Sequence, residues 1–154
     1  MVGVGVDQGV RSLEYVAFPH SLGLFYLAMT QFLGFPTYGD EYKVMGLAAC
    51  GKPDYVEALQ RVVRLEPGGG FSLNLDYFLH HSDGISMTWE DGEPSIGRVF
   101  SDEWIRLLGS PRQKNDEITN RHEDLSASLQ YIYEEAFLHI LEDLARRTGQ
   151  TDLC

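Results

Sequence analysis

The chain has few cysteines, few basic residues and no long apolar run, and each shortage excludes a class of protein. Two cysteines, Cys50 and Cys154, are too few for a disulfide scaffold or a thiolate zinc site. The 12 Lys and Arg residues stand against 23 Asp and Glu, and the resulting net charge of −11 argues against nucleic acid as a partner. No apolar run reaches the roughly 18 residues that a membrane span needs, so we expect no membrane partner.

The start of the chain, residues 1–10, also lacks the basic segment and apolar stretch of a secretory signal. Together with the low cysteine content, this leads us to expect a cytoplasmic location. What the chain does have is an apolar fraction of 44% over 154 residues, which is enough to bury one hydrophobic core. We therefore expect a single domain over residues 1–154.

The first 34 residues predict a hairpin followed by a buried helix. Residues 2–6 and 13–18 read as extended runs on either side of a turn at Asp7, which indicates antiparallel pairing. Residues 21–33 are apolar on nearly every side and end at Gly34, which suits a left-handed helix stop. Such a helix has to be covered by other elements all round.

Two further helices are expected in the next segment. Asp40 can cap a helix over residues 41–48, and the apolar spacing of residues 55–65 predicts another. Gly46 lies inside the first of these helices, where glycine costs about 1 kcal/mol relative to alanine. A glycine at such a position indicates close approach by a neighbouring backbone or by a ligand.

The remaining chain predicts a small antiparallel β excursion and a long final helix. Apolar residues alternate over 71–77, and a second short strand is expected at 85–89. A short helix at 102–108 precedes the strongest element, which begins at Asn120 with a capping box to Glu123 and stops at Gly149. Residues 151–154 resemble the start of a buried strand, and helix, turn and strand in succession indicate an α/β unit.

The isolated histidines do not by themselves indicate a metal centre. His20 is more often a packed or capping residue than a catalytic one, and the adjacent His80 and His81 are expected to be exposed in a loop. Neighbours in an extended segment point to opposite faces, so these two cannot share an ion. From residue type alone, Lys43 is better explained as an exposed lysine balanced by Glu41 than as a ligand for an anion.

Several blocks, in order, resemble the O-carbamoyltransferases of the nodulation-protein and antibiotic-biosynthesis type. They are Phe18-Pro-His-Ser-Leu-Gly-Leu-Phe-Tyr26, Phe32-Leu-Gly-Phe35, Gly39-Asp-Glu-Tyr-Lys-Val-Met-Gly-Leu-Ala48, Arg121-His-Glu-Asp-Leu125 and Arg147-Thr-Gly-Gln-Thr-Asp-Leu-Cys154. The likeness covers about residues 13–154. It implies the central fragment of an N-terminal ASKHA-like catalytic domain: a partial RNase H-like α/β core, here an α+β fragment, with a predominantly helical insertion.

The resemblance also implies an activity and its substrates. The resemblance implies that the longer enzyme makes carbamoyl-adenylate from carbamoyl phosphate and ATP and then passes the carbamoyl group to an acceptor hydroxyl. A divalent metal is implied for the longer enzyme, but the family's metal ligands lie outside this region, so no metal-binding residue is assigned here. We expect no tightly bound cofactor on this chain alone, which by itself is expected to be inactive.

Carried over position by position, the resemblance implies a set of site residues. The candidates for catalysis are His20 and His122. The candidates for binding the nucleotide or the adenylate are Ser21, Gly23, Glu41, Tyr42, Lys43, Gly46 and Arg121. The alternative hypothesis, from a different class, is a non-catalytic interaction domain with an acidic surface and a long helix; an ASKHA sugar kinase would need phosphate-loop signatures that this stretch lacks.

Overall fold

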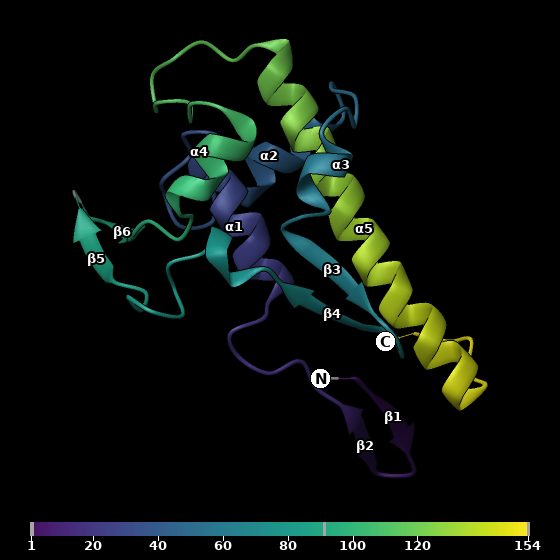
Figure 1. Ribbon diagram of the computed structural model, residues 1–154. Helices are drawn as coiled ribbons and strands as arrows, with labels where there is room; N and C mark the ends of the chain where they lie inside the picture. The colour runs from purple at the N-terminus through teal and green to yellow at the C-terminus, as the bar shows by residue number, and fades with distance from the viewer. Residues whose placement is uncertain (1, 91, 154) are drawn as a thin grey trace.

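A computed structural model describes residues 2–90 and 92–153 of the chain (Figure 1). The elements, in order, are β1 (Val2–Val6), β2 (Gly9–Glu14), α1 (Leu22–Phe32), α2 (Glu41–Ala48), α3 (Val56–Leu59), β3 (Val63–Glu66), β4 (Gly70–Leu73), the 3-10 turn η1 (Leu75–Tyr77), β5 (Met87–Glu90), β6 (Glu93–Ile96), α4 (Asp102–Leu108) and α5 (Asn120–Thr148). Each sheet is an antiparallel pair, β1–β2, β3–β4 or β5–β6. The chain is thus an α+β fragment.

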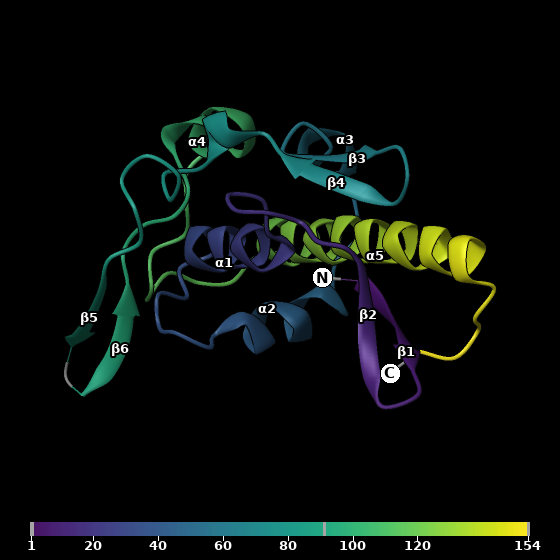
Figure 2. The ribbon, with the colours of Figure 1, turned by 90° about the horizontal axis from the view of Figure 1, so that it is seen from below.

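Helices α1 and α5 lie side by side in a central layer (Figure 2). The β3–β4 pair, α3 and α4 cover one side of this layer, and α2 lies on the other side (Figure 2). The hairpins β1–β2 and β5–β6 project at opposite ends (Figure 2). Among the described residues, no helix is both long and apolar enough to cross a lipid bilayer.

Helix α1 is buried on several sides, as its sequence predicts. Phe25, Ala28, Met29 and Phe32 are all inaccessible to solvent. The helix begins where the Ser21 hydroxyl accepts a hydrogen bond from the Leu24 amide, and Gly34, with φ of +76°, turns the chain away after its end. The cover on α1 therefore has to come from segments far along the chain.

An aromatic cluster supplies much of that cover. The Trp104 ring of α4 packs against Phe25 and Phe32 of α1, with ring centroids 6.3 and 5.8 Å away, and also against Phe78 and Phe100. Offset and edge-on ring pairs at such separations are favourable beyond their area burial. Trp104 is completely buried, and its indole N–H has no partner among the described residues. Ring packing therefore holds α4 to α1.

The N-cap of α5 lies one residue earlier in the chain than the sequence indicates. Thr119 is the N-cap, and His122, not Glu123, occupies the position that returns a hydrogen bond to the cap. The Nδ1 atom of His122 accepts from the Thr119 backbone N–H at 3.0 Å. The predicted stop is confirmed, because Gly149 adopts a left-handed conformation at φ of +69°.

The predicted helix over residues 55–65 is wrong beyond Leu59. Only α3 forms, and Val63–Glu66 instead pairs with Gly70–Leu73 as β3–β4. The β-branched Val62 and Val63 favour extended structure, and Gly68 and Gly69 at positive φ supply the turn. The tertiary pairing thus overrides the helical spacing.

Strand boundaries elsewhere also differ from the prediction. The second strand was expected at residues 13–18. Strand β2 instead begins directly after the turn and ends at Glu14, so residues 15–18 lie outside it. Strand β4 ends at Leu73, because the Asn74 side chain accepts from the Asp76 amide and begins the η1 turn. Residues 151–153 form no strand, and Cys154 lies outside the described residues. A single segment without a partner strand has no ladder to join.

Replacing two glycines by alanine, one inside α2 and one just after it, should change the stability of the fold in opposite directions. Nothing lies within 4 Å of a Cβ placed on exposed Gly46, so no described backbone makes the close approach expected there. We expect Gly46→Ala to stabilise the fold by about 0.5–1 kcal/mol through helix propensity. A Cβ on Gly51 would instead collide with the backbone of Glu123 in α5. Gly51→Ala should therefore destabilise it by about 1–3 kcal/mol, and urea unfolding of both variants would show the reversal of sign.

Candidate functional site

A pocket lies where the N-terminal end of α1 meets α5 and the β3–β4 turn. Its volume is about 340 Å³, and we call it the His20 pocket. Most of its lining is apolar, and the polar side chains are His20, Ser21, Glu14, Asp143 and Arg147. An apolar cavity of this size with a few polar groups is typical of a small-molecule site. Its lining comes from β1, β2, α1, the β3–β4 turn and α5.

A backbone hydrogen bond determines which ring nitrogen of neutral His20 carries the proton. Its Nδ1 atom accepts from the Leu73 amide at 3.1 Å. An accepting nitrogen carries no proton, so in neutral His20 the proton resides on Nε2. In this state His20 can donate a hydrogen bond to a ligand but cannot remove a proton through Nε2.

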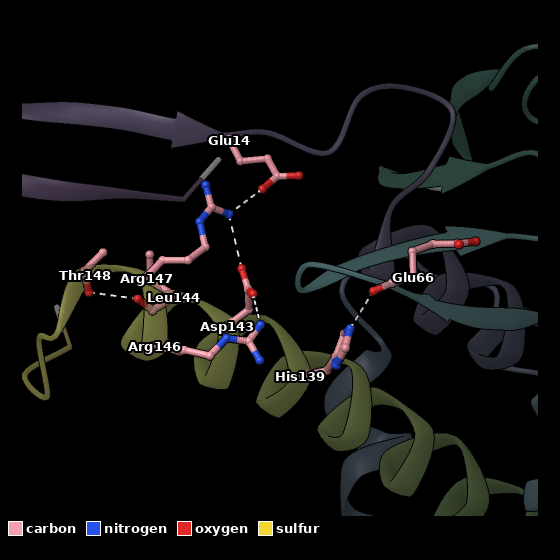
Figure 3. Close-up of polar contacts among 8 residues, drawn as sticks. All are labelled: Glu14, Glu66, His139, Asp143, Leu144, Arg146, Arg147 and Thr148. Atoms are coloured by element: carbon pink, nitrogen blue, oxygen red, sulfur yellow. Dashed lines mark hydrogen bonds and ion pairs between the residues drawn. The ribbon is translucent and has the colours of Figure 1, made fainter.

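An ion-pair network crosses one side of the pocket (Figure 3). Arg147 donates to Glu14 at 2.8 Å and to Asp143 at 3.1 Å, and Arg146 also pairs with Asp143. Burial alone would raise the pKa of Asp143, but the hydrogen bonds and charges of Arg147 and Arg146 together outweigh it and lower the pKa. Hydrogen bonds to Glu14 and Asp143 raise the pKa of Arg147. Asp143 and Arg147 are therefore both charged at neutral pH.

The Lys43 segment lies beyond the opposite end of α1. The Lys43 ammonium group pairs with the buried Asp40 at 2.7 Å and lies 5.7 Å from the centroid of the Phe35 ring. The Asp40 carboxylate is thus engaged with Lys43, and it makes no side-chain cap on α2 of the kind the sequence suggested. Tyr42 is exposed, while the charge of Glu41 acts on the pKa of Tyr26 in α1. Burial, then Tyr133, Glu134 and Glu41, raises the pKa of Tyr26 to about 12.

Arg112 also lies over Phe35, with its guanidinium carbon 5.2 Å from the ring centroid. It donates to the carbonyl of Leu33 at the end of α1 and to those of Lys114 and Asp116 in its own loop. Arg121 similarly donates to the carbonyls of Leu108 and Ser110 after α4. Both arginines therefore secure loop backbone, a role that their sequence positions do not reveal.

The predicted site residues fall into two groups, one at each end of α1. His20 and Ser21 line the His20 pocket, and Gly23 is exposed in the first turn of α1. Glu41, Tyr42, Lys43 and Gly46 lie on α2, with Lys43 near Arg112 through Phe35. Arg121 and His122 lie in the first turn of α5, and the charge of Arg112 acts on the pKa of His122. Among the described residues, the cavity that holds His20 and Ser21 includes no member of the second group.

The expectation that His80 is exposed is wrong. His81 is exposed, as expected. His80 is 2% exposed; its Nε2 contacts the carbonyl of Pro19 at 2.8 Å and its Nδ1 has no partner among the described residues. The rings of Phe18 and Phe78 pack edge-on against it. No local sequence pattern indicates that Glu14 pairs with Arg147, because the two are 133 positions apart.

Residues 2–90 and 92–153 contain no group of three His, Cys, Asp or Glu side chains placed to hold a metal ion. The donor set that a divalent metal needs is therefore not assembled by the described side chains.

The sequence matches the model of the family "Carbamoyltransferase N-terminus" over residues 4–154. The chain belongs to this carbamoyltransferase family. The resemblance inferred from the ordered motifs is thereby confirmed, and both residue groups described above lie within the matched range.

Three curated relatives span the chain. An uncharacterized protein of Synechocystis, sll1178, is 36% identical over 141 residues, covering 90% of this chain and 21% of the relative. The nodulation protein NolO of Bradyrhizobium diazoefficiens is 35% identical over 154 residues, covering 98% and 24%. The nodulation protein NolNO of Sinorhizobium fredii is 31% identical over 150 residues, covering 97% and 18%. The chain therefore spans less than a quarter of each relative.

His122 should make the stability of this chain sensitive to acid. Burial, then the charges of Arg121 and Arg112, lowers the pKa of His122 from 6.5, whereas Asp116 acts in the opposite direction. Because the unfolded chain takes up this proton more readily, the contribution of His122 to stability is full above about pH 6.5 and falls as the pH drops below that value. His122→Gln keeps an acceptor for the Thr119 amide but does not titrate.

We expect urea unfolding to show a smaller loss of stability between about pH 7 and pH 5 for His122→Gln than for the unmodified chain. His81→Gln, at an exposed position, is the matched control and should retain the original pH dependence. Equal pH dependence in the unmodified chain and His122→Gln would contradict the assignment.

Proposed function

We propose that this chain forms part of an ATP-dependent O-carbamoyltransferase, which passes a carbamoyl group from carbamoyl-adenylate to an acceptor hydroxyl. The family match over residues 4–154 is the observation that carries the proposal. The chain spans 21%, 24% and 18% of its three relatives, so we take it as one domain of a longer enzyme, the central part of an ASKHA-like domain. In this scheme the chain alone is inactive, and carbamoyl phosphate, ATP and the acceptor are substrates of the longer enzyme.

Carbamoyl transfer needs hydrogen-bond donors for the oxyanion that develops on the carbonyl oxygen, and a base for the hydroxyl proton. His20 fits the first requirement, since the Leu73 amide occupies Nδ1 and leaves Nε2–H as a donor. We assign His20 to the carbamoyl carbonyl or the acceptor oxygen, and Ser21 and Gly23 to the adjoining wall. A base from elsewhere in the longer enzyme then takes the hydroxyl proton.

The second group supplies positive charge for the phosphate of the adenylate. Lys43 is the residue we assign to that phosphate, because its side chain is 39% exposed while that of its partner Asp40 is 9% exposed. Glu41, Tyr42 and Gly46 would shape the same face of α2. Arg121 adds charge at the start of α5, and we assign His122 a positioning role there through its bond to Thr119.

One observation favours the alternative of an interaction domain. Tyr131, Phe137 and Leu138 of α5 are exposed by 42%, 43% and 54%. Exposed apolar side chains on one helix can dock against a protein surface. If replacing these side chains abolished binding to another segment of the longer enzyme and left carbamoyl transfer unaffected, their role would be docking.

Replacement of Lys43 provides the central test of the transferase proposal. In a full-length carbamoyltransferase that carries this chain, we expect Lys43→Met to reduce transfer by roughly 10-fold or more, the effect of losing a hydrogen bond to a charged group. The assay follows carbamoylated product from carbamoyl phosphate, ATP and a panel of hydroxylated acceptors.

Asp40→Asn is the matched control, because it breaks the same 2.7 Å ion pair but leaves the lysine charge in place. If the two variants lose transfer equally, Lys43 acts only through the ion pair and its assignment to the phosphate is wrong. If no acceptor is carbamoylated by the unmodified enzyme, the transferase proposal itself fails.

A further inference from the structure

His80 is a buried histidine in the loop after η1. It is 2% exposed, and the rings of Phe18 and Phe78 meet its ring edge-on at centroid distances of 5.8 and 5.5 Å. Phe78 belongs to the hydrophobic core and also packs against Trp104. Because residues of this chain enclose His80, its surroundings do not depend on what covers the outer surface.

The ring of His80 donates a hydrogen bond to the segment that leads into α1. Its Nε2 lies 2.8 Å from the carbonyl oxygen of Pro19. A carbonyl oxygen can only accept, so the proton of neutral His80 resides on Nε2 and Nδ1 carries none. Nδ1 has no partner among the described residues, and a buried acceptor without a donor costs free energy. This cost indicates that the Nε2–H donor, and not ring packing alone, accounts for a histidine at this position.

The peptide group between Pro19 and His20 is held at both its oxygen and its nitrogen. The oxygen accepts from His80, and the backbone N–H of His20 donates to the carbonyl of Ala17 at 3.1 Å. Proline has no N–H, so this carbonyl is the one main-chain hydrogen-bonding group of Pro19. A peptide group is planar and includes the Cα of the residue that follows. The two hydrogen bonds on this plane therefore set the position of the His20 Cα.

The position of the His20 Cα decides whether the ring of His20 meets its own partner. The Leu73 amide, which donates to Nδ1 of His20 at 3.1 Å, belongs to β4 and is placed by the pairing of β4 with β3. A hydrogen bond weakens steeply when its geometry departs from the ideal, so displacement of the Cα costs this bond. While the bond is made, neutral His20 keeps its proton on Nε2, in the wall of the His20 pocket.

We propose that His80 is a positioning residue for His20 and acts through the Pro19 carbonyl. With Nε2–H of His80 bound to that carbonyl, His20 keeps its bond to the Leu73 amide and offers a donor to the pocket. Without it, the peptide plane shifts, the Leu73 bond weakens and His20 adopts both neutral tautomers. A role for His80 in carbamoyl transfer rests on the proposed function, which assigns His20 to the carbamoyl carbonyl or the acceptor oxygen.

Nuclear magnetic resonance of the 154-residue chain with isotope-labelled histidine tests the positioning directly. Long-range proton–nitrogen correlation spectra show which ring nitrogen carries the proton, and at about pH 8 histidine is ordinarily neutral. The signals of His20 and His80 are assigned by their disappearance in His20→Gln and His80→Gln. We expect the Nε2–H tautomer for both rings in the unmodified chain. The Nδ1–H tautomer for His80 would overturn the proposal, because Nε2 could then not donate to Pro19.

Three variants separate the donor of His80 from its packing. His80→Phe keeps an aromatic ring in the cluster but has no donor. In this variant we expect His20 to lose its single tautomer and the Leu73 amide to exchange with solvent roughly 2- to 10-fold faster, the effect of losing one hydrogen bond. His80→Gln supplies an amide donor and should retain both properties of the unmodified chain. His81→Phe makes the same substitution at the exposed neighbouring position and should change neither.

Near-ultraviolet circular dichroism shows whether each variant remains folded. A folded His80→Phe in which His20 keeps its single tautomer would overturn the proposal, since His20 would then be placed without the donor. Equal loss of the tautomer in His80→Phe and His80→Gln would also overturn it, because packing alone would explain that result. If His80→Phe does not fold, the tautomer of His80 in the unmodified chain and the spectrum of His80→Gln still test the proposal.

A full-length carbamoyltransferase that carries this chain tests the consequence for transfer. We expect His80→Phe to lower kcat by roughly 10-fold or more, since small misplacements of a catalytic group have effects of this size. In a His20→Gln background the same substitution should have little further effect, because His80 acts through His20. Multiplying losses would contradict the positioning role in transfer. If the unmodified enzyme carbamoylates no acceptor, the proposed function fails, and the tautomers of His20 and His80 still decide the positioning.

Discussion

The fold depends on the burial of α1. Its apolar side chains point in several directions, so covering only one face would leave the others in water. Trp104 and its aromatic neighbours cover part of the helix, while Tyr26 reaches α5 through a 3.0 Å hydrogen bond to Gln130. Because these partners come from the second half of the chain, burying α1 brings the N-terminal and C-terminal segments together. The pocket and the Lys43 segment are arranged at its two ends.

This arrangement explains why the basic residues have two roles. Arg112 and Arg121 are placed near Lys43 and His122, but they already donate to backbone carbonyls that close the loops after α1 and α4. A loop without regular hydrogen bonds leaves carbonyl groups that need donors. Guanidinium groups supply several donors from one side chain. The two guanidinium groups at this end of α1 are therefore held in place by the loops that they close.

The opposite end of α1 has a different physical character. The His20 pocket combines walls fixed by close packing with a hairpin that lies outside the core. Van der Waals contact in a packed interior is insensitive to salt, whereas an exposed ion pair is screened by it. Packed walls and a hairpin that meets α5 through an exposed ion pair thus border the same cavity. The polar network around Asp143 is the junction between them.

The sequence by itself determined the family, the buried α1, the short α4 and the long α5, because ordered motifs, apolar spacing and glycine stops are local signals. It could not determine that residues 63–66 pair as a strand, since that choice depended on a partner turn and on packing against α5. Nor could it reveal that His80 is buried or that Glu14 meets Arg147. Contacts between distant positions leave no periodic pattern along the chain, so only the tertiary structure decides which side chains meet in a site.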